Sequence, residues 1–197
     1  MSHRIRESMR GGELAPFGGT VEADETFLWN DPEKPVRRGY MHKNKILSLV
    51  DRESGEVRSV PIDDVSAKTI VPILKENIAR EARIMTDDAG QYHYLKDDFE
   101  GHDVVCHSQG EYVSPTDPSI HTNTVEGYFS IFKRGMKDVY QHCAEKHMRR
   151  YLAEFDFRYS NRVAKGVDDS ARADKLLKGF KGKRLTYATT HRQGCSV

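Results

Sequence analysis

"TVEADETF", residues 20–27, has the alternation of a half-buried β-strand but carries three acidic residues. Glu22 and Asp24 are two positions apart and share a face, whereas Glu25 points the other way and is expected as an outward or loop-facing charge. Asp is depleted in strands, and a buried carboxylate without a partner is costly. An acid at Asp24 therefore requires a specific explanation.

The segments after this strand predict a mixed sheet. "KILSLVDRESGEVRSVPI" (45–62) has the pattern of a β-hairpin with Gly55 at its turn. "RIMTDD" (83–88) and "HDVVCHS" (102–108) are typical of short strands. Three antiparallel strands followed by parallel strands, with helices between them, predict an α/β fold in which helices cover both faces of the sheet.

Helical spacing of apolar residues predicts the remaining elements. Helices are expected at residues 3–10, 66–82, 89–99, from Thr124 onward, 145–162 and 169–180. In the helix after Thr124, the aromatic residues Tyr128, Phe129 and Phe132 are favoured as core residues over base-stacking residues. The C-terminal part of the chain is therefore expected to be helical.

Charge is distributed unevenly along the 197 residues, although the net charge is only +1. From Gly127 to the end, 16 Lys and Arg stand against 7 Asp and Glu, a net of +9, which leaves −8 for the first 126 residues. This division suits a polyanion substrate handled through metal ions, but it equally suits a solvated acidic surface followed by a basic tail.

Cysteine usage and hydropathy indicate a cytoplasmic protein without a membrane segment. The three cysteines are scattered, and no apolar run has membrane-spanning length. Cys106–His107 and His142–Cys143 could in principle share a zinc ion, but free thiols are favoured.

Acidic residues occur at three positions in the expected elements. Asp24 lies in the first strand, Asp87 or Asp88 ends the "RIMTDD" strand (83–88), and Glu126 lies in the first turn of a helix. Such residues can converge in a mixed sheet and bind hard divalent cations, two of which can promote an in-line phosphoryl displacement. Each also has a structural interpretation. Asp87 could simply end its strand, and Glu126 could belong to a capping box.

The sequence motifs around these acidic residues resemble those of a known family. "TVEADETF", "MTDDAGQY", "SQGEYV", "IHTNTVEGYFSIFKRGMKDVYQH" and "HMRRYLAEFDFRYSNR" closely resemble the DDE transposases of bacterial insertion sequences, in the ISXO-type branch. The similarity runs from about His3 to Tyr187. It implies a ribonuclease-H-like fold, two Mg²⁺ ions that Mn²⁺ can replace, and metal-dependent DNA strand cleavage and strand transfer at insertion-sequence ends.

The resemblance makes three acids the expected catalytic, metal-binding triad: Asp24, Asp87 and Glu126. Asp87 is preferred over Asp88 because it follows Thr86 directly and lies five residues before Tyr92. Asn123 is the alternative third ligand, but a carboxylate binds Mg²⁺ better than an amide does.

Several basic residues are expected to bind DNA phosphates. Lys133 lies seven residues after Glu126, about two helical turns, so both share one helix face. For Lys133 and Arg134 the alternative is a solvated basic face. Further expected phosphate contacts are Lys146, Arg149, Arg150, Lys181, Lys183 and Arg184. Residues expected to support the triad are Glu22, Asp88 and His121.

The resemblance also sets the expected organisation. Residues 1–18 are expected to be a remnant basic helix and linker, 19–165 the catalytic domain, and 166–197 a C-terminal helix and basic tail. The zinc-binding segment and helix-turn-helix that usually precede this domain are expected to be absent, and the loop 29–44 lacks the family's Gly-rich stretch.

The expected partners are DNA, as element ends and target, and a second copy of the chain, because two ends must be handled together. The expected location is the bacterial cytoplasm at the nucleoid. A non-catalytic DNA-binding or assembly remnant and a general metal-dependent nuclease of the same fold remain the alternative functions.

Overall fold

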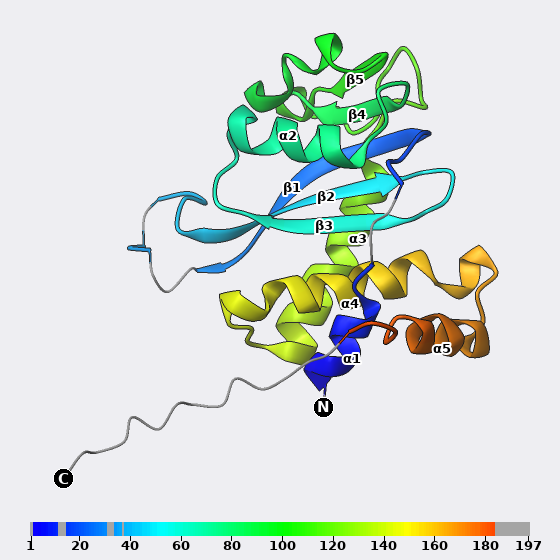
Figure 1. Cartoon of the computed structure of the whole chain (residues 1–197). Helices are drawn as coiled ribbons and strands as arrows, with labels where there is room; N and C mark the ends of the chain where they lie inside the picture. Colours follow the sequence, from blue (N-terminus) through cyan, green and yellow to red (C-terminus); the bar gives the residue numbers. More distant parts are fainter. Residues whose placement is uncertain (1, 12–14, 31–33, 37, 184–197) are drawn as a thin grey trace.

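The computed structural model describes residues 2–11, 15–30, 34–36 and 38–183, and its centre is a five-stranded mixed sheet (Figure 1). The strands are β1 Thr20–Asn30, β2 Lys43–Asp51, β3 Val57–Ile62, β4 Arg83–Asp87 and β5 Gly101–Val105. Their order across the sheet is β3-β2-β1-β4-β5, with β1 to β3 antiparallel and β4 and β5 parallel to β1. These strand directions are the predicted ribonuclease-H-like arrangement, so the predicted fold class is confirmed.

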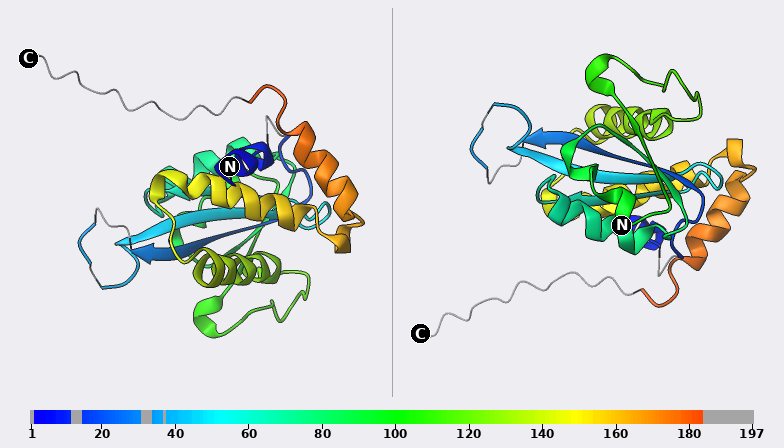
Figure 2. Two further views of the ribbon diagram at one scale, coloured as in Figure 1. Left: turned by 90° about the horizontal axis from the view of Figure 1, so that it is seen from below. Right: turned by 90° about the horizontal axis from the view of Figure 1, so that it is seen from above.

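Helices lie on both faces of the sheet, as expected. Figures 1 and 2 show α2 (Ala67–Asn77) against one face and α3 (Asn123–Arg134) against the other, while α4 (Met148–Ser160) runs along the edge strand β3. The N-terminal α1 (Ser2–Met9) packs against α4, and the C-terminal α5 (Asp169–Lys178) packs against α1. A buried ion pair between Arg6 and Glu154, 2.7 Å apart, attaches α1 to α4.

Alternation along β1 divides the core in two. Val21 and Ala23 face α2 and belong to the first apolar cluster, whereas Leu28 faces α3 and α4 and belongs to the second. The second cluster contains the buried aromatic residues of α3, which are Tyr128, Phe129 and Phe132. The expected core role of these aromatic residues is therefore confirmed.

Two predicted helices differ from the observed elements. Residues 89–99 form two 3₁₀ turns, Gly90–Tyr92 and Leu95–Asp97, instead of one helix, and both Tyr92 and Leu95 belong to the first apolar cluster. The predicted helix 66–82 ends at Asn77, because Ile78 is extended and forms a β-bridge with Phe17.

The end of α3 widens into a π-helical turn, Gly135–Tyr140, which the sequence did not predict. Gly135 packs against the ring of Phe155, and a Cβ at this position would lie 2.5 Å from a ring carbon. A glycine is therefore required for α3 and α4 to approach this closely.

Side chains of α4 close the outer edge of β3. Ser160 Oγ accepts a hydrogen bond from the Val57 N–H (3.0 Å), and Asp156 Oδ2 accepts one from the Ser59 N–H (2.8 Å). Pro61, the next outward position, has no N–H. The edge strand therefore has its outward donors satisfied by side chains.

Asp156 predicts a pH-dependent stability. Complete burial raises the pKa of this carboxyl to about 7, despite hydrogen bonds from the Tyr128 hydroxyl (2.5 Å) and from Ser59. Because the pKa is higher in the folded than in the unfolded state, the stabilisation is complete below about pH 4 and is lost as pH rises through about 7. We expect Asp156→Asn to unfold at nearly the same urea concentration as the wild type at pH 5 and at a higher one at pH 8.5.

The amide suits this test because its oxygen can accept from the Ser59 N–H while its NH₂ donates to the hydroxyls of Tyr128 and Ser59. Asp174→Asn, on α5, is the matched control and should leave the pH profile unchanged. A wild-type profile that rises between pH 5 and 8.5, or an Asp156→Asn profile with the wild-type slope, would contradict the prediction.

Candidate active site

Three acidic residues from three elements are near enough to one another that the charges of two of them raise the pKa of the third. Asp24 lies midway along β1, Asp87 ends β4, and Glu126 lies in the first turn of α3. Burial raises the pKa of Asp24 well above its usual range, and the negative charges of Glu25, Asp87 and Glu126 raise it further. The charge at Asp24 is therefore unfavourable in the absence of a cation.

Asp87 shares this environment. Its pKa is raised by burial and by the charge of Asp88, while an N–H of Ala89 (3.1 Å) and the nearby His107 lower it. Asp88 directly follows the end of β4, is partly buried, and its carboxylate accepts a hydrogen bond from Ser108 Oγ (2.5 Å). The two neighbouring acids therefore have different surroundings.

Glu22 attaches the N-terminus of α3 to β1. Its carboxylate is fully buried, pairs with Arg52 Nε (2.6 Å), and accepts hydrogen bonds from Thr124 Oγ1 (2.7 Å) and the Val125 N–H (2.8 Å). Since Val125 directly precedes Glu126, these contacts hold the third acid against the strand that carries Asp24. Glu22 is thus in contact with the element that positions Glu126.

The capping-box interpretation of Glu126 is wrong. The helix begins at Asn123 with Thr122 as N-cap, and no side chain of the cap bonds a helical N–H. The donor at Val125 is satisfied by Glu22, which is 103 residues away in the sequence. A tertiary contact has therefore replaced the local cap.

Glu25 also differs from the expectation. It points away from Asp24, as predicted, but it is not an outward charge, because the Tyr92 hydroxyl (2.5 Å) and the Gln91 amide (3.3 Å) donate hydrogen bonds to it. Burial raises the pKa of Glu25, and the hydrogen bond from Tyr92 opposes this. Glu25 therefore fixes the turn that follows Asp87.

The other predicted residues near the triad occupy different positions. His121 Nδ1 lies 2.9 Å from Arg52 Nη2 and 3.4 Å from Glu22 Oε1, so it belongs to the Glu22 cluster. The side chain of Asn123 is exposed at the start of α3. Its role as an alternative ligand stays a prediction.

Lys133 extends from α3 toward Asp24. Burial and the charges of Lys137 and Lys43 lower the pKa of Lys133, while the charge of Asp24 raises it. Arg134, its neighbour, is exposed. Lys133 is therefore the predicted phosphate-binding residue that lies beside the triad.

The more distant basic residues fall into two groups. Lys146 and Arg149 are exposed at the start of α4 and line one groove, whereas Arg150 pairs with Glu7 (3.5 Å). Lys181 is exposed, Lys183 donates to the main-chain oxygens of Glu7 and Arg10, and Arg184 lies outside the described residues.

His107 is a residue of the site that the sequence reasoning missed. Its Nε2 lies 3.3 Å from Glu126 Oε1 and 3.0 Å from Thr122 Oγ1, and its proximity lowers the pKa of Asp87. The "CHS" motif contains this residue, but from sequence it suggests only half of a zinc site. Cys106 and Cys143 are free thiols.

The side chains at the site are of the chemical type that binds a hard divalent cation. Three carboxylates supply oxygen ligands, and Asp24 carries an unfavourable charge that a cation would neutralise. Within the described part of the chain, however, no three His, Cys, Asp or Glu side chains are gathered closely enough to hold an ion as they stand. Ion binding would therefore require the carboxylates to draw together.

Comparison with family models identifies the family of the chain. The ISXO2-like transposase domain matches residues 16–160, and the chain belongs to this family. No curated protein shows significant similarity to the chain.

Among solved structures, similar ones include two retroviral integrase catalytic cores. The HTLV-2 integrase core, solved with magnesium in a dimeric form, is 14% identical, has a TM-score of 0.47, and is aligned over 72% of this chain and 86% of that one. The BIV integrase core is 17% identical, with a TM-score of 0.47 and coverage of 69% and 80%. Separately, none of the helices in the described residues is long and apolar enough to cross a membrane.

Proposed function

We propose that the chain is the catalytic core, residues 19–165, of a transposase that cleaves DNA at insertion-sequence ends and joins the freed strand to target DNA. Asp24, Asp87 and Glu126 would together hold two Mg²⁺ ions. The observation that supports this most is the raised pKa of Asp24, caused by burial and by the charges of neighbouring carboxylates that include Asp87 and Glu126. Membership of the transposase family supports the same reading.

The bound ions would supply Lewis-acid activation of the attacking oxygen and neutralisation of the phosphoryl charge. The chain itself would bind the flanking phosphate through Lys133 and keep α3 in place through Glu22. Water attacks the scissile phosphate in line, the P–O3′ bond breaks, and the 3′ oxygen leaves as a hydroxyl. That hydroxyl then attacks a target phosphate, the P–O3′ bond of the target breaks, and its 3′ oxygen leaves as a hydroxyl, so the protein forms no covalent intermediate.

Strand cleavage and joining on an oligonucleotide duplex tests the proposal. The duplex carries the terminal repeats that flank the gene, and the reaction contains Mg²⁺ or Mn²⁺. We expect a nick that leaves a 3′-OH, followed by joined products. If wild type and Asp24→Asn bind the duplex and are equally inactive, the chain is a non-catalytic remnant. Equal cleavage of unrelated duplexes would instead indicate a general nuclease.

His107 gives a second prediction for this reaction. Because its imidazole contacts both Glu126 and Thr122, His107→Ala should let the Glu126 carboxylate move, with a loss of about tenfold to a hundredfold in the cleavage rate. His93→Ala, at an exposed histidine between the two 3₁₀ turns, is the control. Equal rates for wild type and His107→Ala would remove His107 from the site.

DNA and a second copy of the chain are the proposed partners, since a transposition reaction must act on both element ends. The proposed place of action is the cytoplasm, at the nucleoid. A cross-linking experiment on the protein bound to a pair of end duplexes should yield a dimer band that is absent without DNA.

A further inference from the structure

Basic residues at the end of α3 and the start of β2 lie beside the three acidic residues. Lys133 and Lys137 lie on successive turns at the end of α3, and Lys43 begins β2, where it is paired with Asn30 at the end of β1. The charges of Lys137 and Lys43 are both close enough to lower the pKa of Lys133. These three residues therefore form one cationic group beside Asp24.

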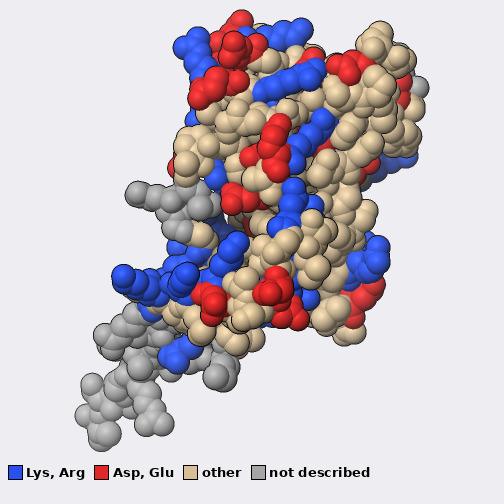
Figure 3. Space-filling model, turned by 90° about the vertical axis from the view of Figure 1, so that its right-hand side faces the viewer, with Lys and Arg blue, Asp and Glu red and all other residues tan. Residues whose placement is uncertain are grey.

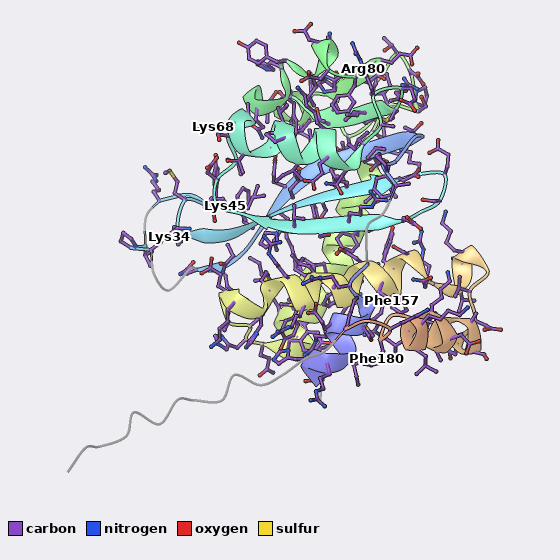
Figure 4. All side chains as sticks on the ribbon, in the orientation of Figure 1. Lys34, Lys45, Lys68, Arg80, Phe157 and Phe180 are labelled. Atoms are coloured by element: carbon purple, nitrogen blue, oxygen red, sulfur yellow. The ribbon has the colours of Figure 1, made fainter. Side chains whose placement is uncertain are left out.

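This cationic group continues into a groove between the start of β2 and the start of α4. The groove has a volume of about 350 Å³ and is lined by Lys43 together with Lys146 and Arg149. Lys34 and Lys45, labelled in Figure 4, line it as well. Among the described residues, five cationic side chains in this groove face two carboxylates, Asp63 and Glu145.

The charges of the groove differ from those on another face of the molecule. Figure 3 shows a face on which Lys and Arg side chains alternate with Asp and Glu side chains over the height of the molecule. A surface of balanced charge attracts a polyanion weakly, whereas a groove with an excess of cations attracts it more strongly. Among the described residues that line it, the groove has an excess of cations.

We propose that the residues Lys133, Lys137, Lys43, Lys146 and Arg149 form a basic track that holds the phosphate backbone of duplex DNA on one side of the reacting phosphate. This inference rests on the proposed function for the position of the reacting phosphate. The contacts are with phosphates only, so the track positions the duplex without reading its sequence.

The length of the track predicts how much DNA it covers. Asn30 follows Asp24 by six residues along β1, which at about 3.3 Å per residue is about 20 Å. Duplex DNA rises about 3.4 Å per base pair, so the groove meets the backbone about six base pairs from the reacting phosphate. A DNA arm shorter than this cannot reach Lys146 and Arg149.

Binding of duplexes with separately shortened arms tests the track. The full chain in EDTA, where no phosphoryl transfer takes place, is titrated with duplexes whose left or right arm has 4 or 14 base pairs. For wild type, we expect shortening of one arm, but not the other, to weaken binding about tenfold at ~100 mM salt. The double variant Lys146→Glu/Arg149→Glu should bind the long duplex about tenfold more weakly and be insensitive to shortening of that arm.

Salt dependence and a matched control complete the test. The slope of log K against log salt should fall by about 1.8 in the double variant, because two phosphate contacts are lost. Arg80→Glu/Lys165→Glu changes the charge by the same amount at two exposed residues outside the groove and should keep the arm-length effect.

An equal loss in both double variants, or a loss in Lys146→Glu/Arg149→Glu that is independent of arm length, would overturn the proposal. If the charge-reversal variant does not fold, Lys146→Gln/Arg149→Gln is subject to the same criteria. Because binding is measured without metal, the result for the basic track does not depend on catalysis. The proposed track can be refuted while the catalytic proposal stands, and the catalytic proposal can be refuted while the track stands.

Discussion

Asp24→Asn should abolish strand cleavage and strand transfer while the protein still folds and binds duplex DNA. Burial, and after it the charges of Glu25, Asp87 and Glu126, raise the pKa of the Asp24 carboxyl well above its usual range. An amide of nearly the same shape cannot replace a charged ligand, so we expect a loss of about a thousandfold or more in the cleavage rate.

Thermal unfolding separates this effect from simple misfolding. The pKa of Asp24 is raised in the folded state, so its ionisation costs stability at neutral pH, and Asp24→Asn should unfold in EDTA at the same or a higher temperature than wild type. Added Mg²⁺ should raise the wild-type midpoint and leave that of Asp24→Asn unchanged.

The neighbouring pair Asp87 and Asp88 supplies the matched control. Asp87→Asn should behave like Asp24→Asn, whereas Asp88→Asn should retain most of its activity, since its carboxylate is bonded to Ser108. Equal inactivation by both substitutions, or normal activity of Asp24→Asn, would refute the assignment.

Glu22→Ala should cause the largest loss of stability of any substitution at the site. It removes the partner of a partly buried Arg52 and leaves the Val125 N–H and the Thr124 hydroxyl without their acceptor. Breaking a buried pair of this kind costs about 3–5 kcal/mol. The free energy of unfolding in urea measures this loss, and cleavage should fall with it because α3 carries Glu126.

An exposed ion pair provides the comparison. Lys75 and Asp98 are 2.6 Å apart, but the lysine side chain is 52% exposed, so Lys75→Ala should cost less than about 1 kcal/mol. In the double variant Glu22→Ala/Arg52→Ala, the loss should be smaller than the sum of the single losses, because no unpaired charge remains buried. A cost for Glu22→Ala no larger than that for Lys75→Ala would show that Glu22 is not an anchor.

The strands were predictable because their signals are local. Alternating apolar residues define β1 and the hairpin β2–β3, and Gly55, with a φ of 67°, occupies the turn where it was expected. The mixed sheet follows from the order of these elements. The aromatic stripe of α3 was likewise visible as helical spacing, and it is buried.

The roles of the acids in "TVEADETF" depended on distant residues and could not be read locally. Glu25 is bonded by Tyr92, 67 residues away, and Glu22 by the N–H of Val125, 103 residues away. The contact of Glu22 with Val125 also stands in place of the expected capping box. His107 was missed because its partners, Thr122 and Glu126, become neighbours only after folding.

The covered edge of β3 affects how the chain aggregates when it is heated. The acceptors for Val57 and Ser59 both come from α4, so any local opening that releases α4 exposes a strand edge with two free donors. An uncovered edge of this kind is a template for intermolecular strand pairing. Aggregation during heating should therefore begin with release of α4, and a cross-link between α4 and β3 should delay it even at an unchanged unfolding temperature.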